Sequence, residues 1–146
     1  MNWLTATNPR LIGLGIFLLR VTVGTILFVA GASKALGWFG GIGMKTTLTY
    51  FKTDSNISAF WAYVSTYAEF IGGLMLIVGL FTRLSAFALT INMLVAVIVV
   101  GTKNFFMGGG AYPFTLMIAC LLILLSGPMQ ISIDNLLARN TERKVI

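Results

Sequence analysis

The most informative absence in this sequence is histidine. The 146 residues include no histidine and a single cysteine, Cys120. Bis-His haem, copper, non-haem iron and most zinc sites need imidazole or several thiolates. A disulfide within the chain, or a Cys-x-x-Cys redox pair, needs a second cysteine. We therefore expect no metal ligands and no cofactor bound covalently or through a metal, so that any electron centre would belong to a partner chain.

Charge is also scarce. Charged residues make up 10% of the chain and hydrophobic residues 58%, whereas an ordinary soluble domain is about 25% charged. The net charge of +6 does not indicate nucleic acid, because the basic residues punctuate apolar runs instead of clustering with aromatic side chains. The composition predicts an integral membrane protein whose surface contacts lipid.

Long apolar runs are what the sequence does have. A membrane-spanning helix needs about 20 apolar residues, and continuous runs favour helices over the alternating pattern of strands. We predict an all-α fold, a single transmembrane domain over residues 1–146 that forms a four-helix bundle. The predicted helices cover residues 11–33, 60–81, 84–101 and 112–127.

The connections between these runs differ in length. Thr82 and Arg83 alone separate the second and third runs, which predicts a tight hairpin. Residues 34–59 carry many aromatic side chains and predict an interfacial loop. After the helix stop at Gly127 and Pro128, Ser132 is predicted to cap a short amphipathic C-terminal helix. Its apolar face would hold Ile133, Leu136 and Leu137.

The basic residues also predict an orientation. Four spans place both termini on one side, and the side richer in Lys and Arg is the cytoplasmic one. The termini side would carry Arg10, Arg83, Arg139, Arg143 and Lys144, and the opposite side Lys34, Lys45, Lys52 and Lys103. This narrow excess predicts cytoplasmic termini.

Two ionisable residues lie inside the apolar runs. Arg20 and Glu69 each lie nine residues into their helix, and an unpaired charge costs about 2.5–3.5 kcal/mol at the centre of a membrane. We predict that they pair at the bundle centre, with Asn92 at a similar depth. The pair would either hold the helices together or act on a ligand, as a contact to a quinone headgroup or as a proton relay. Lys34 would either extend to the interface or contact a ligand or partner.

Small residues accompany these polar groups. Gly24 shares the face of Arg20, and Gly72 and Gly73 share the face of Glu69. Small residues let helix backbones approach closely in membranes. We therefore predict that these faces point into the bundle.

Three segments resemble the DoxX family of membrane proteins. They are LRVTVGTILFVAGASKALGWFGG from Leu19, AEFIGGLMLIVGLFTRLSAFALTINMLVA from Ala68, and LLILLSGPMQISIDNLL from Leu121. The second holds a Glu-x-x-Gly-Gly and a Leu-x-Thr-Arg pattern, and the third a Gly-Pro-x-x-x-Ser-x-Asp pattern. The positions that carry the resemblance are Arg20, Lys34, Glu69, Gly73, Arg83, Asn92 and Asp134.

The resemblance implies a multi-pass protein of the prokaryotic cytoplasmic membrane. Family relatives include the small membrane subunit of thiosulfate:quinone oxidoreductase, which implies an accessory or anchoring subunit of a quinone-linked oxidoreductase with protein partners. Arg20, Glu69, Asn92 and Lys34 would be the candidate quinone contacts, and Glu69 and Arg20 the candidate catalytic groups. Gly24, Gly72, Gly73, Arg83 and Asp134 would be structural. The alternatives are a non-redox assembly subunit and a homo-oligomeric pathway for small solutes.

Overall fold

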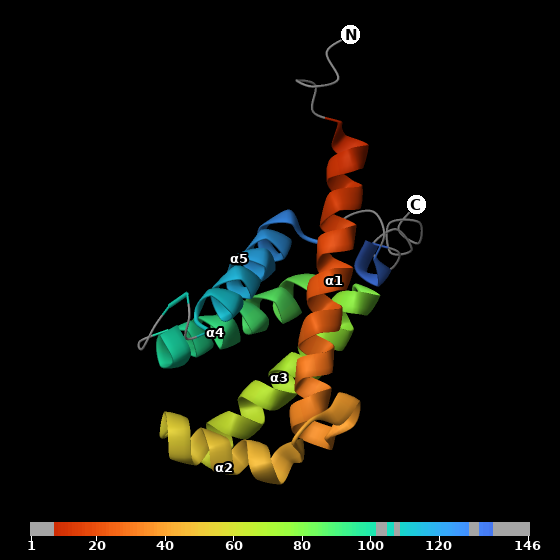
Figure 1. Ribbon diagram of the computed structural model, residues 1–146. Coiled ribbons are helices and arrows are strands. Elements are labelled where there is room, and N and C mark those ends of the chain that lie inside the picture. Colours follow the sequence, from red (N-terminus) through yellow and green to blue (C-terminus); the bar gives the residue numbers. More distant parts are fainter. Residues whose placement is uncertain (1–7, 102–104, 107–108, 129–131, 136–146) are drawn as a thin grey trace.

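The computed structural model describes residues 8–101, 105–106, 109–128 and 132–135. Within these residues every regular element is helical (Figure 1). In chain order the elements are α1 (Pro9–Leu36), the 3-10 turn η1 (Trp38–Gly40), α2 (Gly43–Ser55), α3 (Ala59–Val78), α4 (Thr82–Gly101) and α5 (Ala111–Ser126). The predicted all-α class and helical membrane bundle are confirmed.

Three of these helices are long and apolar enough to cross a membrane. They are α1, α3 and residues Thr82–Val99 of α4, while α5 is apolar but shorter, at 16 residues. The 28 residues of α1 rise about 42 Å, which exceeds the roughly 30 Å hydrocarbon core of a bilayer. Figure 1 shows the N-terminal part of α1 projecting past the other helices. The chain is a multi-pass membrane protein.

Glycines allow α1 and α3 to pack backbone to backbone. A Cβ atom at Gly31 would lie 2.3 Å from the amide nitrogen of Phe70, and one at Gly73 would lie 2.4 Å from that of Phe28. No side chain fits at such distances, so the crossing requires glycine. The rings of Phe28 and Phe70 stack beside it with centroids 5.2 Å apart. The predicted inward face of Gly24, which is also buried, therefore lies against α3.

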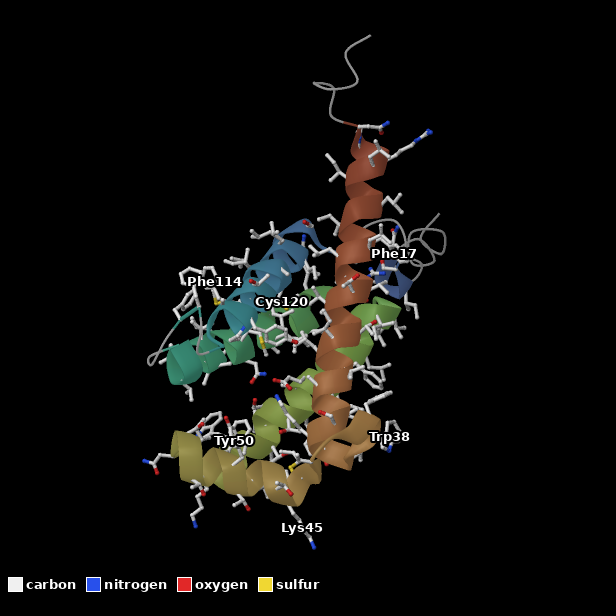
Figure 2. All side chains as sticks on the ribbon, in the orientation of Figure 1. Phe17, Trp38, Lys45, Tyr50, Phe114 and Cys120 are labelled. Atoms are coloured by element: carbon white, nitrogen blue, oxygen red, sulfur yellow. The ribbon has the colours of Figure 1, made fainter. Side chains whose placement is uncertain are left out.

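The other half of the bundle is an apolar core between α1, α3, α4 and α5. Cys120 is fully buried there (Figure 2), as expected for a small apolar side chain. Its buried neighbours in the core are Val23, Leu27, Leu76, Ala86, Leu89, Met93, Leu116 and Ile123. Gly72 joins α3 to this core, because a Cβ there would meet the side chain of Leu89 at 3.1 Å.

The turn between α3 and α4 lies earlier than predicted. Helix α3 ends at Val78, and Thr82 and Arg83 form the first turn of α4 instead of the hairpin. Gly79 has a φ of 75°, a left-handed conformation that ends a helix and that glycine adopts without strain. Phe81 has a φ of 47°, which is uncommon for a bulky residue.

The connection from α1 to α3, expected as an interfacial loop, is mostly helical. It contains η1 and the 13-residue helix α2. Lys45 and Tyr50 lie on opposite sides of α2 (Figure 2), and Thr47 is buried. The sequence hides this helix because α2 holds four threonines, and threonine has a weak helix propensity.

The predicted C-terminal helix lies mainly outside the described residues. Residues 133–135 are helical, and the amide of Asn135 donates to the hydroxyl of Ser132 at 3.2 Å. This is the predicted capping contact at the helix start. Leu136 and Leu137 belong to the residues that are not described.

Candidate functional site

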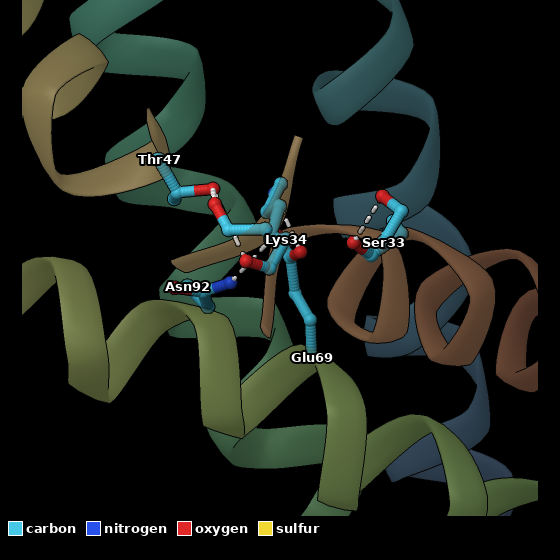
Figure 3. Close-up of polar contacts among 7 residues, drawn as sticks. Ser33, Lys34, Thr47, Glu69 and Asn92 are labelled. Atoms are coloured by element: carbon cyan, nitrogen blue, oxygen red, sulfur yellow. Dashed lines mark hydrogen bonds and ion pairs between the residues drawn. The ribbon is translucent and has the colours of Figure 1, made fainter. Parts of the chain in front are cut away.

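An ion pair joins the end of α1 to the middle of α3. The ammonium of Lys34 lies 2.5 Å from Oε2 of Glu69 (Figure 3). The Glu69 side chain is 5% exposed and the Lys34 side chain 30% exposed. A carboxylate buried to this extent needs a cation or several donors close by. Lys34 therefore serves as the counter-ion of Glu69.

Asn92 completes this polar cluster from α4. Its amide nitrogen donates to Oε1 of Glu69 at 3.3 Å, so each carboxylate oxygen has a partner. An ammonium carries three donors and a side-chain amide two, and one donor of each is used on Glu69. Lys34 and Asn92 therefore keep further N–H groups. We call these three residues, Lys34, Glu69 and Asn92, the polar triad.

The triad lies in the wall of a large apolar cavity. Its volume is about 630 Å³, within the usual range for small-molecule sites. The end of α1, one side of α2, and the facing sides of α3 and α4 line it. The other lining side chains are chiefly aliphatic or aromatic, among them Tyr50, Trp61, Phe87, Ile91 and Val95. The chemistry is that of an apolar pocket with one charged, hydrogen-bonding spot.

Helix α2 is held over this cavity by a contact that the sequence analysis missed. The buried hydroxyl of Thr47 lies 3.2 Å from the backbone oxygen of Lys34 and 2.8 Å from that of Gly43. Its one proton can go to either carbonyl, and donation to that of Lys34 joins α2 to the end of α1. A threonine in a polar segment gives no sequence signal for such a role.

The predicted Arg20–Glu69 ion pair is wrong. Gly31 packs on the backbone of Phe70, so Glu69 lies beside the C-terminal end of α1, where Lys34 is. Lys34 follows Arg20 by fourteen residues, a rise of roughly 21 Å along the helix. Depth counted from the helix ends misplaces Arg20, because α1 begins well beyond the ends of the other helices (Figure 1).

Arg20 instead holds the C-terminal segment. Its Nη1 donates to the backbone oxygen of Pro128 at 3.0 Å. Its guanidinium carbon lies 5.5 Å from the centroid of the Phe17 ring, within range of a cation–π contact. A Cβ at Gly79 would lie 2.9 Å from Nη1, so the guanidinium also packs on the turn between α3 and α4.

Asp134 completes this second cluster by capping α4. Its carboxylate accepts from the amides of Phe81 and Thr82, both at 2.8 Å, and its own amide donates to the carbonyl of Gly79. Burial raises the pKa of Asp134, but the hydrogen bonds from Thr82 and Phe81 and the charge of Arg20 outweigh burial and hold that pKa below its usual value. We call the contacts of Arg20 and Asp134 with this turn and with Pro128 the C-terminal latch.

The other predicted structural residues lie near the C-terminal latch or at the helix contacts. Arg83 packs on Gly127, where a Cβ would lie 3.1 Å from its Nε. Gly24 and Gly73 lie at the contact of α1 with α3, and Gly72 faces α4. Of the four candidate ligand contacts, the structure brings Lys34, Glu69 and Asn92 together and places Arg20 elsewhere.

Comparison with known proteins identifies the family of this chain. The family model DoxX matches residues 15–102, which is more than half of the chain. The chain belongs to the DoxX family. The matched range contains the whole polar triad and Arg20, whereas Asp134 lies beyond it. In this DoxX protein the triad and the cavity are therefore built within the family's matched segment.

A curated relative adds a second similarity. The chain is 32% identical over 121 residues to a Bacillus subtilis (strain 168) protein named "Putative oxidoreductase CatD". The alignment covers 83% of this chain and 85% of that protein. No solved structure matches the chain.

Proposed function

We propose that this DoxX protein is the membrane subunit of a quinone-linked oxidoreductase complex, an accessory chain that holds a quinone ring while a partner carries the electron centre. The observation that supports the proposal best is the polar triad in the wall of the apolar cavity. The name of the Bacillus subtilis relative points to oxidoreductase chemistry, and the family resemblance points to quinone.

The residues present fit such a ligand. A quinone is a neutral apolar ring with carbonyl oxygens that accept hydrogen bonds. Lys34 and Asn92 retain N–H donors beyond those used on Glu69, and the remaining wall is largely apolar. Lys34 and Asn92 would orient the ring through its oxygens, and the buried Glu69 would hold Lys34 in place. When bound, the quinone would supply the electron-accepting chemistry.

One observation favours a non-redox assembly subunit as the second candidate. Both oxygens of Glu69 already have partners within the chain, so the triad can serve simply to join α1, α3 and α4. The two candidates differ in whether the cavity holds a ligand and whether the complex contains a redox subunit.

The first experiment is gentle purification from native membranes, followed by mass spectrometry, a visible spectrum and solvent extraction of quinone. We expect a co-purifying chain with haem or flavin and a stoichiometric quinone. The double variant Lys34→Met/Glu69→Leu removes both charges together and should lose the quinone. Lys45→Met, which removes an exposed cation on the other side of α2, should retain it. A colourless protein that carries neither quinone nor a redox partner would refute the proposal.

We also propose that the protein resides in the cytoplasmic membrane with both termini inside. Four basic residues, Lys34, Lys45, Lys52 and Lys103, lie on the side opposite the termini, against five on the termini side. The positive-inside rule counts Lys and Arg, so this excess supports cytoplasmic termini.

A further inference from the structure

The cavity is edged by exposed apolar side chains. Eight of its lining residues are themselves exposed, and the six bulky ones that lie on α2, α3 and α4 form what we call the rim. The rim consists of Tyr50 on α2, Trp61 and Val64 on α3, and Phe87, Ile91 and Val95 on α4. An aqueous opening would be edged by polar or charged groups, whereas these side chains suit contact with lipid. In a membrane protein such a rim marks an opening toward the bilayer.

The polar triad is balanced in charge. The cation of Lys34 is matched by the anion of Glu69 in direct contact, so the cavity has no net charge to attract an ion. A phospholipid phosphate would have to compete with Glu69 for Lys34, in a site with little water to offset the separated charge. A neutral headgroup that accepts hydrogen bonds meets no such penalty.

The cavity is also longer than a ring needs. Its wall on α4 extends from Phe87 to Val99, a rise of about 18 Å. Asn92 lies within this stretch, and apolar side chains continue on both sides of it. Ala88 and Ala96, one turn before and one turn after Asn92, leave room along this wall.

We propose that the opening between α2, α3 and α4 is a lateral portal through which a neutral, tailed amphiphile enters directly from the bilayer. Its ring reaches the polar triad, and its apolar tail lies along α4 and leaves over the rim into lipid. The proposal rests on the quinone-binding function and adds that the tail, and not only the ring, is recognised.

Trp61 provides a reporter because it belongs to the rim, whereas Trp38 does not line the cavity. The chain has three tryptophans, so Trp3→Phe/Trp38→Phe leaves Trp61 alone. This protein, in nanodiscs of zwitterionic phospholipid, is titrated with 1,4-naphthoquinone and with the same ring carrying a prenyl tail. Quenching of Trp61 is measured against the mole fraction of quinone in the lipid, which corrects for partitioning.

We expect saturable quenching by both probes, with the tailed probe half-saturating at an about tenfold lower mole fraction, which corresponds to about 1.4 kcal/mol of packing contacts between the tail and the α4 wall beyond those that lipid provides. Ala96→Phe narrows the wall and should remove the advantage of the tail. Leu94→Phe is the matched control, because Leu94 lies on α4, is exposed and does not line the cavity. It should retain the advantage.

The outcomes separate the portal from the function. If both probes half-saturate at the same mole fraction, with quenching that is lost in Lys34→Met/Glu69→Leu and unchanged in Ala96→Phe, the ring site is supported and the portal is wrong. Saturable quenching by a brominated phospholipid that quinone does not displace would also overturn the portal, since the occupant is then a structural lipid. If neither quinone quenches saturably, the portal and the quinone-binding function both fail.

Discussion

Lys34 and Glu69 face each other across the contact between α1 and α3, but they are not equally buried. The lysine side chain is 30% exposed and the glutamate 5% exposed. Substitution of either partner leaves the charge of the other unpaired. The two residues differ in how they can then lower the cost of that unpaired charge. Lys34 can extend its ammonium toward the interface, whereas Glu69 would keep only Asn92.

The first prediction follows from this asymmetry. Lys34→Met should lower the free energy of unfolding by about 3 kcal/mol, because a buried carboxylate loses its cation. Glu69→Gln should cost about 1 kcal/mol, since it removes a charge and keeps hydrogen-bonding atoms. Thermal unfolding of both variants in one detergent is the measurement. An equal or larger loss for Glu69→Gln would contradict the burial assigned to the pair.

The second prediction concerns the C-terminal latch. The folded-state pKa of Asp134 is lowered, so its contribution to stability is present above the unfolded-state pKa of about 3.9. It is lost as pH falls through the lower folded-state value. Asp134→Asn should lose about 1 kcal/mol at pH 7 through the weakened cap of α4.

Melting temperatures of wild type and Asp134→Asn between pH 7 and pH 3 test the latch. The difference between them should shrink as the pH falls below about 4. A difference that stays constant over this range would show that the carboxylate charge does not support the cap.

The third prediction uses glycines of α1. Gly31→Ala would place a Cβ 2.3 Å from the amide nitrogen of Phe70, which forces α1 and α3 apart and should cost about 3 kcal/mol. Gly13→Ala is the matched control, because a Cβ there meets nothing within 4 Å. It should leave stability unchanged or raise it by about 0.5–1 kcal/mol through higher helix propensity. Thermal unfolding of the two variants should therefore shift in opposite directions or by very different amounts.

The fourth prediction concerns the attachment of α2. Thr47→Val removes the hydroxyl that bonds to the end of α1 and should speed amide hydrogen exchange in α2 about fivefold, which corresponds to about 1 kcal/mol for one hydrogen bond. Thr49→Val is the control, since that exposed hydroxyl bonds only within α2, to the carbonyl of Lys45. Equal exchange in the two variants would rule out Thr47 as the anchor.

The fifth prediction tests the proposed orientation. Lys45 is exposed on α2, on the side of the protein that we place outside the cytoplasm. In Lys45→Cys, a membrane-impermeant thiol reagent added to intact cells should label the protein. The native Cys120 is fully buried, so wild type should stay unlabelled and provides the background. Labelling that requires cell lysis would reverse the orientation.

The sequence predicted the membrane-spanning helices well, but it did not predict which side chains of different helices meet. The apolar runs gave α1, α3, α4 and α5 to within a few residues, because run length and hydropathy are local properties. Helix α2 was missed because its threonines and lysines carry little helical signal, and it forms against the ends of α1 and α3. The start of α4 is capped by Asp134, which lies 52 residues further along the chain than Thr82.

The candidate site shows the same division. Residue chemistry alone identified Arg20 and Glu69 as charges inside the apolar runs, with Asn92 at a similar depth. It paired Glu69 with Arg20 and left Lys34 to the interface or to a ligand or partner. Only the packing of α1 on α3 decides the pairing. The close contact at Gly31 determines which turn of α1 lies beside which turn of α3, and it places Lys34 beside Glu69. Composition determined that this is a helical membrane protein, since a chain that spans lipid must satisfy its backbone hydrogen bonds internally and continuous apolar runs do so as helices. The tertiary structure decided which charges meet and that a cavity opens beside them, since both depend on the register between helices distant in the sequence.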